Sequence, residues 1–329
     1  MLQYLVILLD DTSVAYCHAD TPLTKRNLIP IETLKKAILF GMKENLMIQY
    51  VLPEYDLPQA YYDTMESIDN VKIYGSLASL PSMSENPDTD VVIYTIVPEA
   101  VDSQNIVIRL SFTEMMNKRY DIASLLPNIN RLNLVITDVA QFSDEQAELY
   151  KHALNEWAKI LLTEFKRGKQ PQVNVLTDRL QLDAMHNCEA GVGNITVAPN
   201  GKFYLCPAFY YDEQMGVNNR LNHHNPSSEQ SVGDLENGLQ IPNPQLLKLD
   251  HAPLCRICDA YQCRRCIWLN QKLTWDNNTP SHQQCVLAHL ERNASRNLQK
   301  KMQQGDFEIK NKRIKEIKYL DPFDIREQF

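Results

Sequence analysis

The sequence contains no apolar run of the length that a membrane-spanning helix needs. The apolar run near its N-terminus, Leu5 to Leu9, is short and has no basic flank or cleavage site, so we predict no signal peptide. Positive charge is not in excess either, because 33 Lys and Arg stand against 41 Asp and Glu, a formal net charge of −8. We therefore expect a cytoplasmic protein with reduced cysteines that binds neither a membrane nor nucleic acid.

Several common catalytic patterns are missing as well. The 329 residues contain no P-loop, no glycine-rich phosphate-binding turn and no Ser/His/Asp spacing. No internal repeat is visible. The hydrophobic fraction of 44% and the charged fraction of 22% are nevertheless ordinary for a globular protein of one or two domains. The candidates for chemistry that are left are the cysteines.

The first half of the chain alternates between strand and helix patterns. The continuous apolar run Tyr4–Leu9 is typical of a strand buried on both faces. The clearest helix is Asp144–Arg167, which Ser143 and Gln146 open as a capping box. Further strands are predicted at Met47–Leu52, Val71–Tyr74, Val91–Ile96, Ile106–Leu110, Leu132–Thr137 and Val173–Leu176. This alternation predicts an α/β fold with a parallel sheet, either open or closed into a partial barrel.

The composition changes near residue 186, where cysteines and turn residues replace the alternation. The tripeptide Pro199-Asn200-Gly201 predicts a hairpin between two short strands. Residues Val286–Met302 have the pattern of a helix, and the stretch Lys300–Lys318 is basic. Such a basic run is typical of a solvated helix face or tail.

Seven of the eight cysteines lie between Cys188 and Cys285. In a reducing compartment this clustering favours metal or iron–sulfur ligands over disulfides. Two Cys-x2-Cys pairs, which begin at Cys255 and Cys263, are four residues apart, and both zinc and iron–sulfur sites use such pairs. The candidate metal ligands are Cys188, Cys206, Cys255, Cys258, Cys263, Cys266 and Cys285.

The residues alone leave three interpretations open for these thiols. They could hold iron–sulfur clusters, they could hold zinc, or they could be unligated structural thiols. Seven thiols exceed what one tetrahedral zinc ion binds, which favours clusters. His282 and His289 flank Cys285 and are candidates for an additional ligand.

The cysteine spacing resembles that of the SPASM domain, an auxiliary iron–sulfur module of many radical SAM peptide-modifying enzymes. Cys188 is followed after twelve residues by Gly201, and after four more by Cys206. The later part begins with Cys-x2-Cys at Cys255, has two gaps that are each one residue shorter than the family's, and closes with Cys285. The match covers about 100 residues.

This resemblance implies one or two 4Fe–4S clusters and a division of the ligands between them. The first set would be complete, and its members would be Cys255, Cys258, Cys263 and Cys285. The second set would lack a fourth ligand, and its members would be Cys188, Cys206 and Cys266.

The N-terminal strand is followed by a sequence that resembles a degenerate radical SAM motif. When Cys17 takes the third position of that family's Cys-x3-Cys-x2-Cys motif, Asp10 and Val14 occupy the other two. The Gly-Gly-Glu-like segment of the family is also missing, because the chain has Tyr50–Glu54 there. The opening stretch Tyr4–His18, together with the C-terminal cysteines, resembles the CXXX-repeat peptide maturase family.

The resemblance implies three domains: a degenerate, incomplete radical-SAM-like βα barrel over residues 1–180, a small cysteine-rich SPASM-like domain over 181–290, and a helical basic tail over 291–329. It further implies an accessory maturase for a ribosomally synthesised, post-translationally modified peptide, without its own cleavage of S-adenosylmethionine. The expected partners are the precursor peptide and a radical SAM maturase. The alternative is a zinc-stapled peptide- or protein-binding module with no redox role.

Overall fold

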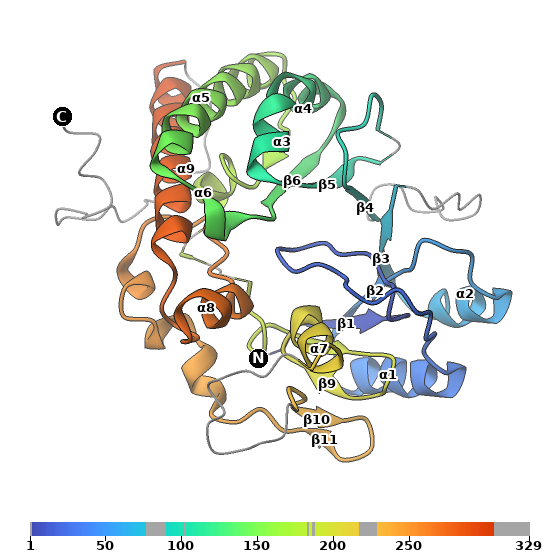
Figure 1. Ribbon diagram of the computed structural model, residues 1–329. Coiled ribbons are helices and arrows are strands. Elements are labelled where there is room, and N and C mark those ends of the chain that lie inside the picture. The colour runs from blue at the N-terminus through green and yellow to red at the C-terminus, as the bar shows by residue number, and fades with distance from the viewer. Residues whose placement is uncertain are drawn as a thin grey trace. The chain divides into compact units, whose positions relative to one another are not determined.

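The computed structural model describes residues 2–76, 90–101, 103–182, 184–185, 188–216 and 229–305. The chain forms two compact units, each built from two stretches of sequence (Figure 1). Unit 1 comprises Met1–Ile93 and Glu189–Lys248, and unit 2 comprises Tyr94–Cys188 and Leu249–Phe329. Each unit therefore combines part of the strand–helix alternation with part of the cysteine-rich segment. Within the described residues, no helix has both the length and the apolar character needed to cross a membrane.

The sheet of unit 1 is centred on β1, the strand predicted from the first apolar run. Parallel neighbours flank β1 on both sides, β2 on one and β8 on the other. Beyond β2 the parallel order continues through β3 to β4, and β9 pairs with β8 in the antiparallel direction. The strands are β1 (Tyr4–Leu8), β2 (Met47–Val51), β3 (Asn70–Gly75), β4 (Val91–Tyr94), β8 (Asn194–Val197) and β9 (Phe203–Tyr204). Leu5 and Ile7 on one face and Val6 and Leu8 on the other are all buried, as a strand covered on both faces requires.

Helix α1 (Ile31–Lys43) covers this sheet with an apolar stripe that includes Leu34 and Ile38. Gly41 lets the helix approach closely, because a Cβ atom there would lie 2.8 Å from Cδ1 of Ile48. The other elements of unit 1 are α2 (Gln59–Met65), α7 (Pro207–Gln214), the hairpin of β10 (Gly233–Asp234) and β11 (Gly238–Leu239), and η3 (Pro244–Leu247).

Unit 2 contains a second set of parallel strands, in which β6 pairs with β5 and with β7. Its longest helices, α5 (Asp144–Lys166) and α9 (His282–Gln304), pack side by side (Figure 1). The remaining strands and helices are β5 (Asn105–Leu110), β6 (Arg131–Ile136), β7 (Gln172–Val173), α3 (Phe112–Asn117), α4 (Arg119–Leu125), α6 (Asp178–Gln181) and α8 (Ile267–Thr274). The short 3-10 turns are η1 (Leu126–Asn128), η2 (Val139–Gln141), η4 (Leu249–His251) and η5 (Cys255–Ile257).

Most local predictions agree with these elements. The capping box of Ser143 and Gln146 opens α5, and Pro199-Asn200-Gly201 joins β8 to β9 with Gly201 at φ +75°. The strand predicted at Val173–Leu176 is shorter, because only Gln172–Val173 pairs with β6 among the described residues. The predicted tail begins within α9, and its part beyond residue 305 lies outside the described residues. The three domain boundaries stay a prediction.

Candidate metal centre

Four of the predicted ligands lie near one another in unit 2. Cys255, in the short turn η5, is buried in a small apolar cluster with Met185 and Ala252. Cys258 and Cys263 pack against the same cluster. The thiol of Cys263 also lies close enough to those of Cys255, Cys258 and Cys285 for their charges to raise its pKa. The four members of the first predicted set thus share one neighbourhood, which Cys285 joins from α9.

Burial keeps these thiols protonated in the metal-free protein. Loss of solvation raises the pKa of Cys255, raises that of Cys258 to about 11, and raises that of Cys263 well above the ordinary value. Within the described residues, no three Cys, His, Asp or Glu side chains are grouped as a metal ion would require. A metal must therefore draw these sulfurs together and displace their protons. The ligand assignment stays a prediction.

The surroundings of these cysteines nevertheless fit a group that is bound by thiolates. The buried guanidinium group of Arg265 acts against the effect of burial on the pKa of Cys255. At Cys258 the N–H of Ala260 and the guanidinium group of Arg292 lower the pKa, whereas the neighbouring carboxylate of Asp259 raises it. Sulfur ligands in a buried, partly cationic setting suit an anionic thiolate site. The residues present are therefore compatible with an iron–sulfur cluster.

Two nitrogen atoms approach the sulfur of Cys258. The backbone N–H of Ala260 donates to it at 3.4 Å, and Nε2 of His289 lies 3.6 Å away. His289 is one turn beyond Cys285 on α9, so both side chains occupy the same face of that helix. Of the two histidines considered from the sequence, the structure brings His289 to the cysteines, whereas His282 is exposed at the start of α9.

The second predicted set is divided between the units. Cys266 precedes α8, where its sulfur accepts from the backbone N–H of Leu269 at 3.5 Å. The thiol of Cys188 lies 4.0 Å from the carbonyl oxygen of Arg265, the residue before Cys266. These two cysteines belong to unit 2, while Cys206 precedes α7 in unit 1.

The loop after β1 is organised by the carboxylate of Asp10, which is fully buried. Its Oδ1 accepts from the backbone N–H and the hydroxyl of Thr12, at 2.8 and 2.5 Å, and its Oδ2 accepts from the backbone N–H of Asn27 at 2.7 Å. Burial, and next the nearby carboxylate of Asp10, raise the pKa of Tyr55. Both oxygens of Asp10 are therefore already engaged in holding the loop.

The other two positions of the degenerate motif differ in character. Val14 is buried, and its Cγ1 would lie 3.1 Å from a Cβ atom at Gly75 on the neighbouring strand β3. Cys17 is half-buried, and its charge contributes to the raised pKa of Tyr211 on α7. Of the three motif positions, Asp10, Val14 and Cys17, Cys17 alone carries a thiol.

Two tyrosines of α7 lie against the loop that follows β1. No pattern in the sequence pointed to this contact. The hydroxyl of Tyr210 donates to Oδ1 of Asp11, and Tyr211 lies close enough to the loop for the charge of Asp11, after burial, to raise its pKa. Both tyrosines are buried, and burial raises the pKa of each. Their signal in the sequence is the aromatic run directly after Cys206, although the sequence does not indicate which loop it contacts.

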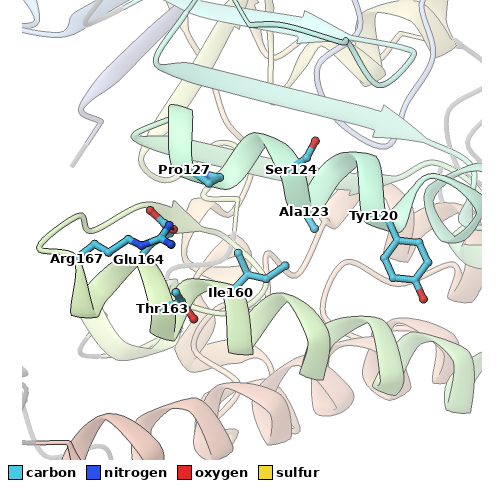
Figure 2. A pocket seen from close by; sticks show the side chains of 8 residues that line it. All are labelled: Tyr120, Ala123, Ser124, Pro127, Ile160, Thr163, Glu164 and Arg167. Carbon is cyan, nitrogen blue, oxygen red and sulfur yellow. The ribbon is translucent and has the colours of Figure 1, made fainter.

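A pocket of about 440 Å³ lies elsewhere in unit 2, between α4, η1 and α5 (Figure 2). Ala123, Pro127 and Ile160 give it apolar walls. At one end Glu164, which is 2% exposed, forms an ion pair with Arg167 at 2.7 Å. None of its lining residues is a cysteine, so the pocket is separate from the candidate ligands.

Glu291 on α9 should make stability depend on pH. Burial raises its pKa to about 7, although hydrogen bonds from Tyr150 and Gln262 oppose this. The neutral carboxyl therefore favours folding most at a pH below about 4.5, and this contribution is lost as the pH rises through 7. We expect the melting temperature of the wild type to fall relative to that of Glu291→Gln between pH 5 and 8. Parallel curves for the two proteins would contradict this.

The chain is similar to known proteins in its structure. No protein-family model and no curated protein matches the sequence. Among solved structures, the chain is similar to native anSMEcpe with bound AdoMet and Cp18Cys peptide, at a TM-score of 0.57 and 9% identity, over 92% of this chain and all of that chain (100%). A histidine-tagged anSMEcpe with bound AdoMet gives a TM-score of 0.58 at 9% identity, over 92% and 96%.

Streptococcus suis SuiB bound to precursor peptide SuiA is similar at a TM-score of 0.46 and 14% identity, over 87% of this chain and 76% of that chain. The match to anSMEcpe is the one that shows the fold. The architecture is radical-SAM/SPASM-like. The predicted fold class, an α/β fold with a radical-SAM-like incomplete βα barrel, is thereby confirmed. The separate cysteine-rich domain stays a prediction.

Proposed function

We propose that this protein is an accessory maturase for a ribosomally synthesised, post-translationally modified peptide. It carries 4Fe–4S clusters on its C-terminal cysteines and does not cleave S-adenosylmethionine itself. The shared fold supports a role beside peptide-modifying enzymes, because anSMEcpe has that fold and its structure holds AdoMet and a peptide. Fold alone does not transfer an activity, so the proposal depends on the residues at each site.

The observation that carries this proposal is the hydrogen bonding of Asp10. A radical SAM cluster needs three thiolates at this loop, and the carboxylate at the first position already accepts three hydrogen bonds from Thr12 and Asn27. A hard carboxylate is also a poor replacement for a soft thiolate on iron. The loop thus supports its own conformation through side-chain hydrogen bonds, without a cluster as its organising centre.

The two predicted cysteine sets keep their assigned roles in this proposal. Cys255, Cys258, Cys263 and Cys285 hold one cluster, and their shared neighbourhood in unit 2 supports this set. The family resemblance assigns Cys188, Cys206 and Cys266 to the other. A bound cluster supplies one-electron transfer or a structural staple. The protein itself buries Cys255, partly buries the other six cysteines, and supplies backbone N–H groups that face Cys258 and Cys266.

The finer assignments follow from the same resemblance. We propose that the chain is a degenerate radical SAM protein of the CXXX-repeat peptide maturase type, with domain boundaries near residues 180 and 290. Its partners are the precursor peptide and an active radical SAM maturase. The cluster would pass electrons to that enzyme or hold the surface that binds the peptide.

The test follows 5′-deoxyadenosine by mass spectrometry after anaerobic reconstitution, reduction and addition of S-adenosylmethionine, with and without the peptide. We expect no product above a no-protein control, and we expect the peptide or the partner enzyme to be retained in a pull-down. The double variant Asp10→Cys and Val14→Cys tests whether thiolates alone restore turnover. Turnover by the wild type would overthrow the accessory role, and a lack of both turnover and binding would contradict a role in peptide maturation.

A further inference from the structure

A buried carboxylate lies directly beside one of the predicted cluster ligands. Asp259 follows Cys258, is fully buried, and accepts hydrogen bonds from three arginine side chains. Its Oδ1 accepts from Nη1 of Arg292 at 3.2 Å. Its Oδ2 accepts from Nη2 of Arg296 at 2.7 Å and from Nη2 of Arg179 at 3.3 Å. A charge buried this deeply is stable only with such partners.

These arginines come from two different helices. Arg179 lies in α6 and also donates through Nε to the backbone carbonyl of Asp259 at 2.9 Å. Arg292 and Arg296 lie one turn apart on α9, the helix that carries Cys285. Asp259 therefore ties the loop of Cys258 to the helix of Cys285 through its side chain and its main chain. The guanidinium groups of Arg179 and Arg292 are themselves fully buried.

The same anchor sets the environment of the sulfur. The backbone N–H that donates to Sγ of Cys258 belongs to Ala260, the residue directly after Asp259. Because arginines hold both the side chain and the main-chain carbonyl of Asp259, the N–H group of Ala260 keeps its direction toward the sulfur. Hydrogen bonds to ligand sulfurs raise the potential of an iron–sulfur cluster, because they stabilise its more negative reduced form. Residues that hydrogen-bond to metal ligands commonly affect both the affinity for the metal and its redox potential.

We propose that Asp259 is the positioning residue of the first cluster. Held by Arg179, Arg292 and Arg296, it fixes the loop of Cys258 to the helix of Cys285 and aims the Ala260 N–H at the Cys258 sulfur, which would ligate the cluster. This role rests on the proposed function, since it requires that Cys258 binds a cluster. Well-packed apolar side chains in place of this ion network would support folding equally well. The network therefore positions Cys258 and does not serve stability alone.

The experiment uses the full chain with Asp259→Asn, reconstituted with iron and sulfide under anaerobic conditions. Asn keeps the size of the side chain but loses its charge, so two of the three arginine contacts weaken. We expect about a 10- to 100-fold lower chelator concentration to strip the iron. We also expect a lower midpoint potential in a redox titration followed by electron paramagnetic resonance. Loss of the buried negative charge alone would raise the potential, so a lower value reports the weakened hydrogen bond from the N–H of Ala260.

The matched control is Glu164→Gln, which removes another buried carboxylate paired with an arginine in the same unit, outside the cysteine loop. Its iron retention and potential should equal those of the wild type. If Asp259→Asn does not fold by circular dichroism, Arg296→Gln replaces it, because Arg296 is the least buried of the three partners at 24% exposure. That variant should fold and show a smaller shift in the same direction.

The outcomes separate this role from the proposed function. Iron retention and a potential equal to the wild type in Asp259→Asn, with only a lower melting temperature, would overturn the positioning role and leave a structural ion network. The same shifts in Glu164→Gln would overturn it too. A wild type that takes up no iron would overturn the proposed function, and this role with it.

Discussion

Replacing Cys258 by Ser should release metal from the first cysteine set and lower the melting temperature by about 10 °C or more. A metal site that forms only in the folded chain adds its binding free energy to folding, and a serine oxygen is a poor ligand for iron. Cys258 should be sensitive because it packs with Cys255 and Cys263, and its sulfur faces Ala260 and His289. Thermal unfolding under anaerobic conditions, with iron and zinc analysis of the same samples, measures both effects.

Cys17→Ser is the matched control, because Cys17 lies in unit 1 and outside the first set. It should change the melting temperature by at most a few degrees and leave the metal content unchanged. If Cys258→Ser melts at the wild-type temperature with the wild-type metal content, these cysteines hold no structural metal. If both variants lose metal equally, the assignment of Cys17 as a bystander is wrong.

Asp10→Ala should destabilise the protein by about 2–4 kcal/mol, the cost of leaving three partly buried hydrogen bonds without their acceptor. The donors are the backbone and hydroxyl of Thr12 and the backbone of Asn27. Asp10→Asn should cost less, because the amide oxygen still serves one side of the loop while its NH₂ group meets a donor on the other. Denaturant unfolding gives the difference in free energy directly.

Asp63→Ala provides the control for Asp10→Ala. Asp63 is exposed on α2, where it accepts a hydrogen bond from Gln59, so its loss should cost well under 1 kcal/mol. An equally small cost at Asp10 would mean that its carboxylate does not organise the loop, and that it is free to serve as a ligand. That result would remove the main support for the absence of a radical SAM cluster.

The strands and helices could be predicted because their signals are local. The apolar run at β1 and the capping box at α5 each depend on residues within one element. The division of the chain into two units could not be predicted in the same way. Unit 1 closes when β8, far along the chain, pairs with β1, and this pairing depends on contacts between distant segments.

The same contrast between local signals and long-range contacts applies to the candidate site. The cysteine spacing indicated thiolate chemistry. The family resemblance implied which four thiols form the first set, and that assignment stays a prediction. The spacing did not indicate that Asp259 would meet arginines from α6 and α9, because those partners are 80, 33 and 37 residues away. The contact between Tyr210 and Asp11 spans 199 residues and was equally inaccessible. Long-range polar contacts arise from the fold, so sequence spacing carries no signal for them.

The most direct test of the central claim is iron, acid-labile sulfide and zinc analysis of the protein purified without oxygen. The account predicts about four iron and four sulfide per bound cluster, with one or two clusters per chain, and little zinc. The Cys258→Ser variant should lose about one cluster's share of both elements. Zinc at one or two equivalents without sulfide would contradict the account and support a zinc-stapled binding module.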